Sequence, residues 1–100
     1  MIDFQKIEGF QWDEGNIHKN EKHGVHFQEA EQIFTNEPLV LLSDEKHSQR
    51  EKRYHAIGRT NEGRMLHVSF TLRELNTRIR IISARNANRR ERSIYEQEKA

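Results

Sequence analysis

The chain has 100 residues, enough for one domain with a single two-layer core. It has no cysteine, which excludes disulfides and thiolate metal sites, and no secretion signal or bilayer-length apolar run, so we expect a cytoplasmic protein that does not enter a membrane. Charge is balanced overall but not along the chain: residues 1–51 carry 5 basic and 11 acidic side chains, and residues 52–100 carry 12 and 5. The basic half should give one side of the molecule a positive field that suits phosphate.

The first half of the chain is predicted to hold two helices. A short strand-like segment at 7–11 precedes Asp13, a suitable N-cap for a helix over 14–23, and Gly24 can end that helix in the left-handed conformation. A second helix follows and stops at the breaker formed by residues 36–38. Its apolar side chains recur at helical spacing and form a core face: Phe27, Ala30, Ile33 and Phe34.

The second half is predicted to form an antiparallel sheet. Short strands are expected at 39–42, 53–58 and 78–83, with a polar loop after the first of them. The segment at 64–71 alternates apolar and polar residues, as a half-buried strand does. Neighbouring strands are joined by short turns, which favours antiparallel pairing.

Asn86 is predicted to cap a final helix that runs to about Glu98. No linker, repeat or low-complexity segment divides the chain, so residues 1–100 are expected to form a single domain. The predicted class is α+β, a small antiparallel β-sheet with two N-terminal helices and one C-terminal helix packed on one face. The opposite face should stay open to water. The side chains expected there are Arg53, His55, His67, Ser69, Arg78 and Arg80.

Four segments of the sequence resemble the BrnT family of toxins in order and spacing. They are FQWDE at 10–14, KHGVHFQEAEQIF at 22–34, EKRYHAIG at 51–58 and RIRIISARNANRRERSIY at 78–95. The resemblance implies a RelE-like fold and the toxin of a type II toxin-antitoxin system, a small ribonuclease that cuts RNA and arrests growth. It also implies a BrnA-like ribbon-helix-helix antitoxin, through which alone the complex would contact promoter DNA.

Two positions depart from the family pattern. A lysine usual shortly after the WD pair is replaced by Asn16, which removes one possible phosphate contact. A serine or aspartate before the second helix is replaced by His26, which is a poorer N-cap. The positions that match the motif are Lys22, His23, Glu51, Arg53, Arg80, Arg85, Glu91 and Tyr95.

Metal-independent RNA cleavage needs a base for the ribose 2′-OH, stabilisation of the charge on phosphorus, and a proton for the 5′-oxygen. A guanidinium can grip two phosphate oxygens and stays charged, so Arg53, Arg80 and Arg85 are the predicted phosphate clamp. Lys22 is expected to position the RNA backbone. Glu51 is a candidate base, or serves only to orient Arg53.

Further residues are candidates for RNA binding. Arg78, His55 and His67 are expected on the open face, and an imidazole can exchange protons near neutral pH, although a surface or packing role is an alternative for each histidine. Trp12 could stack on a base or could wedge the first helix against the sheet. The arginines at 89, 90 and 92 could contact RNA or antitoxin, or could simply be solvated.

Three motif residues are expected to support the structure. Glu91 should pair with Arg85 or Arg53, because an unpaired carboxylate on an inward helix face is costly. Tyr95 is expected in the core, and His23 at a helix end, where an imidazolium complements the dipole. His18, His23 and His26 lie close in sequence, but their spacing matches no common zinc motif, so we expect no metal or cofactor.

Two other functions remain open on sequence grounds. The protein could be a non-catalytic partner that binds RNA, or acts as a co-repressor with a DNA-binding antitoxin. It could also be a relic that has lost activity through changes such as Asn16. RNA cleavage separates the ribonuclease from both, and partner-dependent promoter binding separates the partner from the relic.

Overall fold

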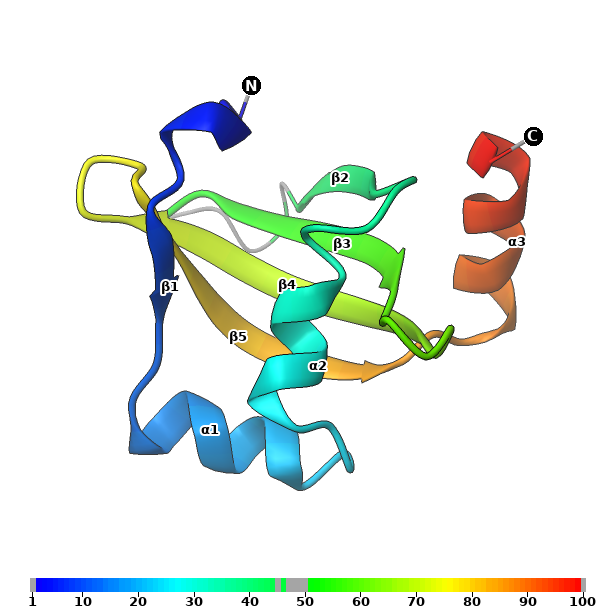
Figure 1. Cartoon of the computed structure of the whole chain (residues 1–100), viewed down its shortest axis with the longest axis horizontal. Coiled ribbons are helices and arrows are strands. Elements are labelled where there is room, and N and C mark those ends of the chain that lie inside the picture. The colour runs from blue at the N-terminus through cyan, green and yellow to red at the C-terminus, as the bar shows by residue number, and fades with distance from the viewer. Residues whose placement is uncertain (1, 45, 47–50, 100) are drawn as a thin grey trace.

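The computed structural model describes residues 2–44, 46 and 51–99 and shows an α+β fold (Figure 1). The α+β class and the two N-terminal helices and one C-terminal helix that the sequence predicts are confirmed. The elements in chain order are a 3-10 turn η1 (Phe4–Lys6), β1 (Gly9–Gln11), α1 (Glu14–Glu21), α2 (Phe27–Gln32), β2 (Val40–Asp44), β3 (Arg53–Arg59), β4 (Met65–Arg73), β5 (Arg78–Asn86) and α3 (Arg89–Lys99).

The five strands form one sheet in the order β1-β5-β4-β3-β2. The chain meanders through β2, β3, β4 and β5 with antiparallel pairing, as predicted from the short turns. The sheet is mixed rather than wholly antiparallel, because β1 pairs in parallel with the start of β5. The two helices that follow β1 carry the chain across the sheet to the opposite edge, where β2 begins, so β1 cannot form a hairpin with its neighbour.

The main core lies between α2 and one face of the sheet (Figure 1). Ala30 of α2 and Ile33, which caps its C-terminal end, are fully buried against alternate residues of β3, β4 and β5. The ring of Phe34 packs edge-on against that of Phe70, with 5.1 Å between the ring centroids. The periodicity of α2 and the alternation of β4 therefore predicted this interface from the sequence. The buried residues of the core are Val25, Ala30, Ile33, Ala56, Leu66, Val68, Phe70, Ile79, Ile81 and Ala84.

Helix α3 packs on the opposite face, which differs from the predicted arrangement with all helices on one face. Tyr95 of α3 is buried in a second cluster with Val40, Ile57, Met65 and Ala87. Neighbouring residues of a strand point to opposite faces, so Ala56 joins the main core and Ile57 joins this second cluster, and both are fully buried. The sheet is thus covered on both faces at the end where α3 lies, and the other face is open only beyond α3.

Helix α3 is capped by Asn88, not by Asn86 as predicted. The side-chain Oδ1 of Asn88 accepts a hydrogen bond from the backbone N of Glu91 at 2.9 Å, and Glu91 Oε1 accepts one from the backbone N of Asn88 at 2.9 Å. This reciprocal pair is a capping box. Asn86 remains in β5 because that strand continues through its pairing with Leu66 on β4.

Helix α1 covers the edge of β5 that β1 leaves unpaired. Asn16 lies in the first turn of α1, is only 5% exposed, and donates from Nδ2 to the backbone oxygens of Ile81 at 2.9 Å and Gln11 at 3.1 Å. It also forms a capping box with Asp13. Asn16 therefore joins α1 to the sheet from a buried position. No helix in the described part of the chain is long and apolar enough to cross a membrane.

Candidate active site

The face beyond α3 carries three cross-strand rows of side chains, because residues directly paired in a sheet point to the same side. The central row contains polar groups and one exposed leucine: Leu42, His55, Ser69 and Ser83. The outer row holds charged groups around a threonine: Asp44, Arg53, Thr71 and Arg80. The row under α3 is Val40, Ile57, His67 and Arg85. The sheet thus sets two histidines between arginines.

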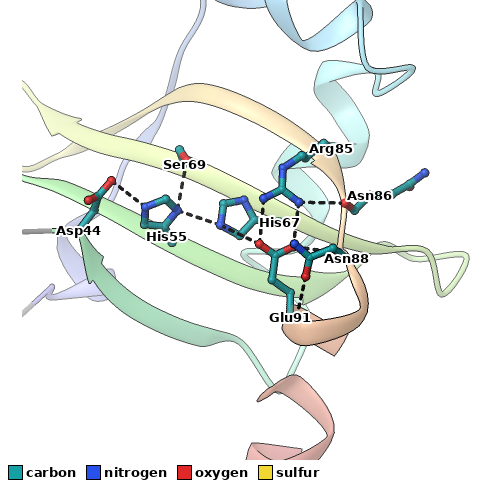
Figure 2. Close-up of polar contacts among 8 residues, drawn as sticks. All are labelled: Asp44, His55, His67, Ser69, Arg85, Asn86, Asn88 and Glu91. Atoms are coloured by element: carbon teal, nitrogen blue, oxygen red, sulfur yellow. Dashed lines mark hydrogen bonds and ion pairs between the residues drawn. The ribbon is translucent and has the colours of Figure 1, made fainter. Parts of the chain in front are cut away.

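The two histidines and Asp44 form one hydrogen-bonded chain across β2, β3 and β4 (Figure 2). His55 Nε2 lies 2.7 Å from Asp44 Oδ2, and His55 Nδ1 lies 2.8 Å from His67 Nε2. Ser69 Oγ approaches the same Nδ1 at 3.3 Å. The side chain of His55 is 26% exposed and that of Asp44 only 8%, so His55 is the accessible member of the chain.

Arg85 and Glu91 extend this chain to α3 (Figure 2). The guanidinium of Arg85 donates from both terminal nitrogens to the two carboxylate oxygens of Glu91, each at 2.8 Å. Glu91 Oε2 also lies 3.6 Å from His67 Nε2. Since Glu91 belongs to the capping box of α3, one carboxylate joins the start of the helix, the arginine of β5 and the histidine of β4.

The charge states of these groups follow from their surroundings. Burial lowers the pKa of His67 from 6.5 to about 4, with the charges of Arg85 and His55 acting in the same direction and Glu91 against it. Burial alone would raise the pKa of Glu91, but hydrogen bonds from Arg85 and from the Asn88 backbone bring it below its usual value. The hydrogen bond to Glu91 raises the pKa of Arg85. His67 is therefore neutral at neutral pH, beside a charged pair.

The histidine pair can gain or lose one proton without moving. With His55 Nε2–H donating to the Asp44 carboxylate, Nδ1 of neutral His55 accepts from His67 Nε2–H. If Nδ1 takes up a proton, His67 changes tautomer and accepts that proton's hydrogen bond instead. Both hydrogen bonds survive the change. General acid-base catalysis needs a group of this kind.

The arginines of the predicted clamp lie on both sides of the histidines. Arg80 and Arg53 belong to the outer row, and Arg85 to the row under α3. Arg80 is held in place by Asp13, whose Oδ2 lies 2.9 Å from Nη2, and by the amide oxygen of Gln11 at 3.3 Å. The Arg80 side chain is 20% exposed. The guanidiniums of Arg80 and Arg85 are thus fixed by protein contacts before any substrate arrives.

Two predicted site residues, Glu51 and Arg78, pair with neighbours at the far end of the sheet. Glu51 accepts a hydrogen bond from Arg73 Nη2 at 3.0 Å, so Arg73 engages its carboxylate. Arg78 donates to Glu74 at 3.1 Å. Both pairs are exposed.

Three other predicted site residues lie away from the histidine chain. Trp12 packs against the main core on the opposite face and donates to Glu31 Oε2 at 2.7 Å, which matches its alternative role as a wedge. Lys22 and His23 are exposed at the C-terminal end of α1. Within the part of the chain that the structure describes, no three His, Cys, Asp or Glu side chains are grouped as a metal site requires.

Asp44 is the site residue that the sequence did not indicate, because the predicted strand ended at Leu42 and Asp44 was assigned to the loop. The observed β2 extends to Asp44, which pairs with Arg53. The alternation of Val40, Leu42 and Asp44 was the available signal, since it places Asp44 on the same face as the histidines.

A comparison with protein-family models gives one match on the chain. Residues 12–91 match a family described as the ribonuclease toxin, BrnT, of a type II toxin-antitoxin system. A search of curated proteins found no match. The matched range begins at Trp12, just before the N-cap of α1, and ends at Glu91, so it contains Asp44, both histidines and Arg85.

Proposed function

The chain belongs to the BrnT family of ribonuclease toxins of type II toxin-antitoxin systems, and we propose that it cleaves RNA internally and without a metal ion, through Asp44, His55 and His67. The observation that carries this proposal is the hydrogen bond between the two imidazoles, with Asp44 behind them. Their nitrogens are directed at one another and at a carboxylate, an arrangement suited to moving protons.

In the proposed reaction the ribose 2′-oxygen attacks the adjacent phosphorus, and the bond to the 5′-oxygen breaks. His55 Nδ1 takes the proton of the 2′-OH as His67 changes tautomer to accept the hydrogen bond of the new N–H, and the ribose hydroxyl takes the place of Ser69 Oγ beside this nitrogen. Asp44 holds His55 in the required tautomer and stabilises the imidazolium that forms. The departing 5′-oxygen takes its proton from water and becomes the 5′-hydroxyl of the downstream fragment, while the upstream fragment ends in a 2′,3′-cyclic phosphate.

The arginines on either side of the central row would stabilise the charge that develops on phosphorus. Arg80 and Arg85 are supported by Asp13 and Glu91, and a guanidinium with a fixed position loses little entropy when it binds phosphate. Arg53 shares the outer row with Arg80 and is the third member of the proposed clamp. A phosphate over Ser69 would thus lie between fixed positive charges.

The family implies an antitoxin partner. We propose that this partner is a BrnA-like ribbon-helix-helix protein and that it covers the sheet face that carries His55 and His67. The toxin-antitoxin complex would contact promoter DNA only through the antitoxin. RNA is the substrate in this scheme, and the toxin acts in the cytoplasm, where growth arrest through RNA cleavage takes place.

The test is cleavage of a long single-stranded RNA by purified protein in excess EDTA. We expect wild-type protein to produce fragments with 2′,3′-cyclic phosphate ends, and His55→Asn to cleave at least about 100-fold more slowly, because a positioned base contributes on that order. His18→Asn, at an exposed position on α1, is the matched control and should cleave normally. Cleavage that stops in EDTA, or an unimpaired His55→Asn, would exclude the proposed mechanism.

A further inference from the structure

A second cluster of arginines lines a pocket on the far side of α3 from the histidines. The pocket has a volume of about 430 Å³ and lies between α3, the end of β3 and the turn that leads into β4. Its lining includes the guanidinium side chains of Arg59, Arg64 and Arg92 and a single carboxylate, Glu96. Positive charge therefore exceeds negative charge on its walls.

Two of these arginines are locked in position by the protein. Arg64 donates from Nε to Asn86 Oδ1 at 2.7 Å and from Nη1 to both carboxylate oxygens of Glu29 at 3.1 Å. Arg59 lies over the ring of Tyr95, with its Cζ 5.5 Å from the ring centroid, and pairs with Glu96 at 3.0 Å. Arg92 is exposed, and its Nε donates to the backbone oxygen of Ala87 at 3.2 Å.

The placement of Arg92 is unfavourable for the isolated protein. It lies in the first turn of α3 together with Arg89 and Arg90, where the helix dipole disfavours positive charge. Glu91, the acidic residue of this turn, is already engaged by Arg85. The hydrogen bond to the Ala87 oxygen holds Nε of Arg92 but brings no formal negative charge, so an anion bound beside this side chain would offset its repulsion by the helix dipole.

The pocket is connected to the candidate active site through Asn86. The backbone oxygen of Asn86 accepts from Arg85 Nη1 at 3.2 Å, while its side chain accepts from Arg64. Arg89 and Arg90 are exposed in the first turn of α3, which follows Arg85 and Asn86 closely in the chain. Positive charge is thus present at Arg85, in the first turn of α3 and in the pocket, and Asn86 contacts an arginine of each site, as a bound polyanion would require.

We propose that this arginine pocket is a second phosphate-binding site, which holds the RNA backbone several nucleotides from the scissile phosphate. The proposal rests on the proposed function for its substrate class. RNA fits the observations better than an acidic segment of the antitoxin, because Asn86 joins the pocket to Arg85 of the candidate active site, where the RNA substrate would be cut. The site would contribute to binding of long RNA and not to the chemical step.

The test is binding of uncleavable 2′-O-methyl RNA in two lengths, about twelve and about four nucleotides, to wild type, Arg92→Gln and Arg92→Glu. For the longer RNA, Kd should rise about three- to tenfold with Arg92→Gln, and the slope of log K against log salt should fall by about 0.7, the value for one phosphate contact on a single strand. The shorter RNA, which cannot span both sites, should bind all three proteins equally. Lys19→Gln and Lys19→Glu on α1 make the same charge changes at another exposed position and serve as controls.

Equal losses for both lengths, or equal losses in the Lys19 controls, would show a general charge effect and overturn the proposal. So would unchanged RNA binding by Arg92→Glu, and weaker antitoxin binding by that variant would then assign the pocket to the antitoxin. The outcome is independent of catalysis. If the wild-type protein binds RNA but does not cleave it, the proposed function is wrong, and the second phosphate-binding site is judged by the Arg92 variants alone. If the wild-type protein cleaves RNA and the Arg92 variants bind RNA normally, only the second phosphate-binding site is wrong.

Discussion

Glu91 binds Arg85, caps α3 and lies beside His67. Glu91→Gln should lower the free energy of unfolding by about 2 kcal/mol near neutral pH, because it replaces two charge-assisted hydrogen bonds and leaves Arg85 without a counterion. Urea unfolding followed by circular dichroism measures this. Glu96→Gln, at the exposed pair with Arg59 on the same helix, should change stability by no more than about 0.5 kcal/mol. Equal effects of the two substitutions would mean that the Glu91 pair is no stronger than a surface ion pair.

The sequence predicts to which face of the sheet a site residue points where that face follows from the alternation of side chains along a strand. His55, His67 and Ser69 were expected on one face, and the observed register places them there. Their contact was not predictable, because it joins residues on a diagonal of the hairpin and so depends on the register of the turn between β3 and β4. The pairing of Glu51 with Arg73 could not be foreseen either, because it spans the same hairpin at its open end.

At the scale of elements, the attachment of α1 to β5 depends on Asn16. Asn16→Ala should destabilise the protein by about 2 to 3 kcal/mol, since it removes the half of the capping box in which Asn16 Oδ1 accepts from the Asp13 backbone N and leaves the backbone oxygen of Ile81 without its Asn16 donor. Asn16→Lys should also destabilise, because a charged side chain would replace a buried one. Asn88→Ala removes only the N-cap of α3 and should cost about 1 kcal/mol. Chemical denaturation compares the three, and a stable Asn16→Lys protein would show that this position tolerates the lysine usual in the family.

Helices and strands themselves were mostly predictable, with boundaries that differ by a few residues. The strands were longer than expected: β4 and β5 each extend to nine residues through pairing with their neighbours, which no local pattern reports. The face of the sheet on which α3 packs was predicted wrongly for a related reason. Two consecutive buried residues, Ala56 and Ile57, show that β3 is covered on both faces, but a short apolar pair in a sequence does not say which element provides the cover.

At the scale of the whole molecule, α3 covers one end of the sheet and lies over a network of ionisable side chains. His67 is 7% exposed, and α3 covers it from above with Glu91 while Arg85 flanks it on β5. Asp44 and His55 face the same network from β2 and β3. Protonation of His67 would add a charge in this confined space, so the docking of α3, and with it the stability of the fold, should depend on pH.

Stability should therefore fall as the solution becomes acidic, between about pH 6.5 and pH 4. Burial lowers the pKa of His67 from 6.5 to about 4, so over this range the unfolded chain takes up a proton that the folded chain does not. The stabilisation is fully present above pH 6.5, and about 3 kcal/mol of it is lost by pH 4.

Thermal or urea unfolding measured across this range should show that the free energy of unfolding falls with pH in wild type and in His18→Gln. In His67→Gln the same plot should be much flatter. The low pKa of Glu91 adds its own loss only below about pH 4.5, so the upper part of the range reports on His67. A slope that persists in His67→Gln between pH 6.5 and 5 would assign the effect to another group and show that His67 is not held neutral beneath α3.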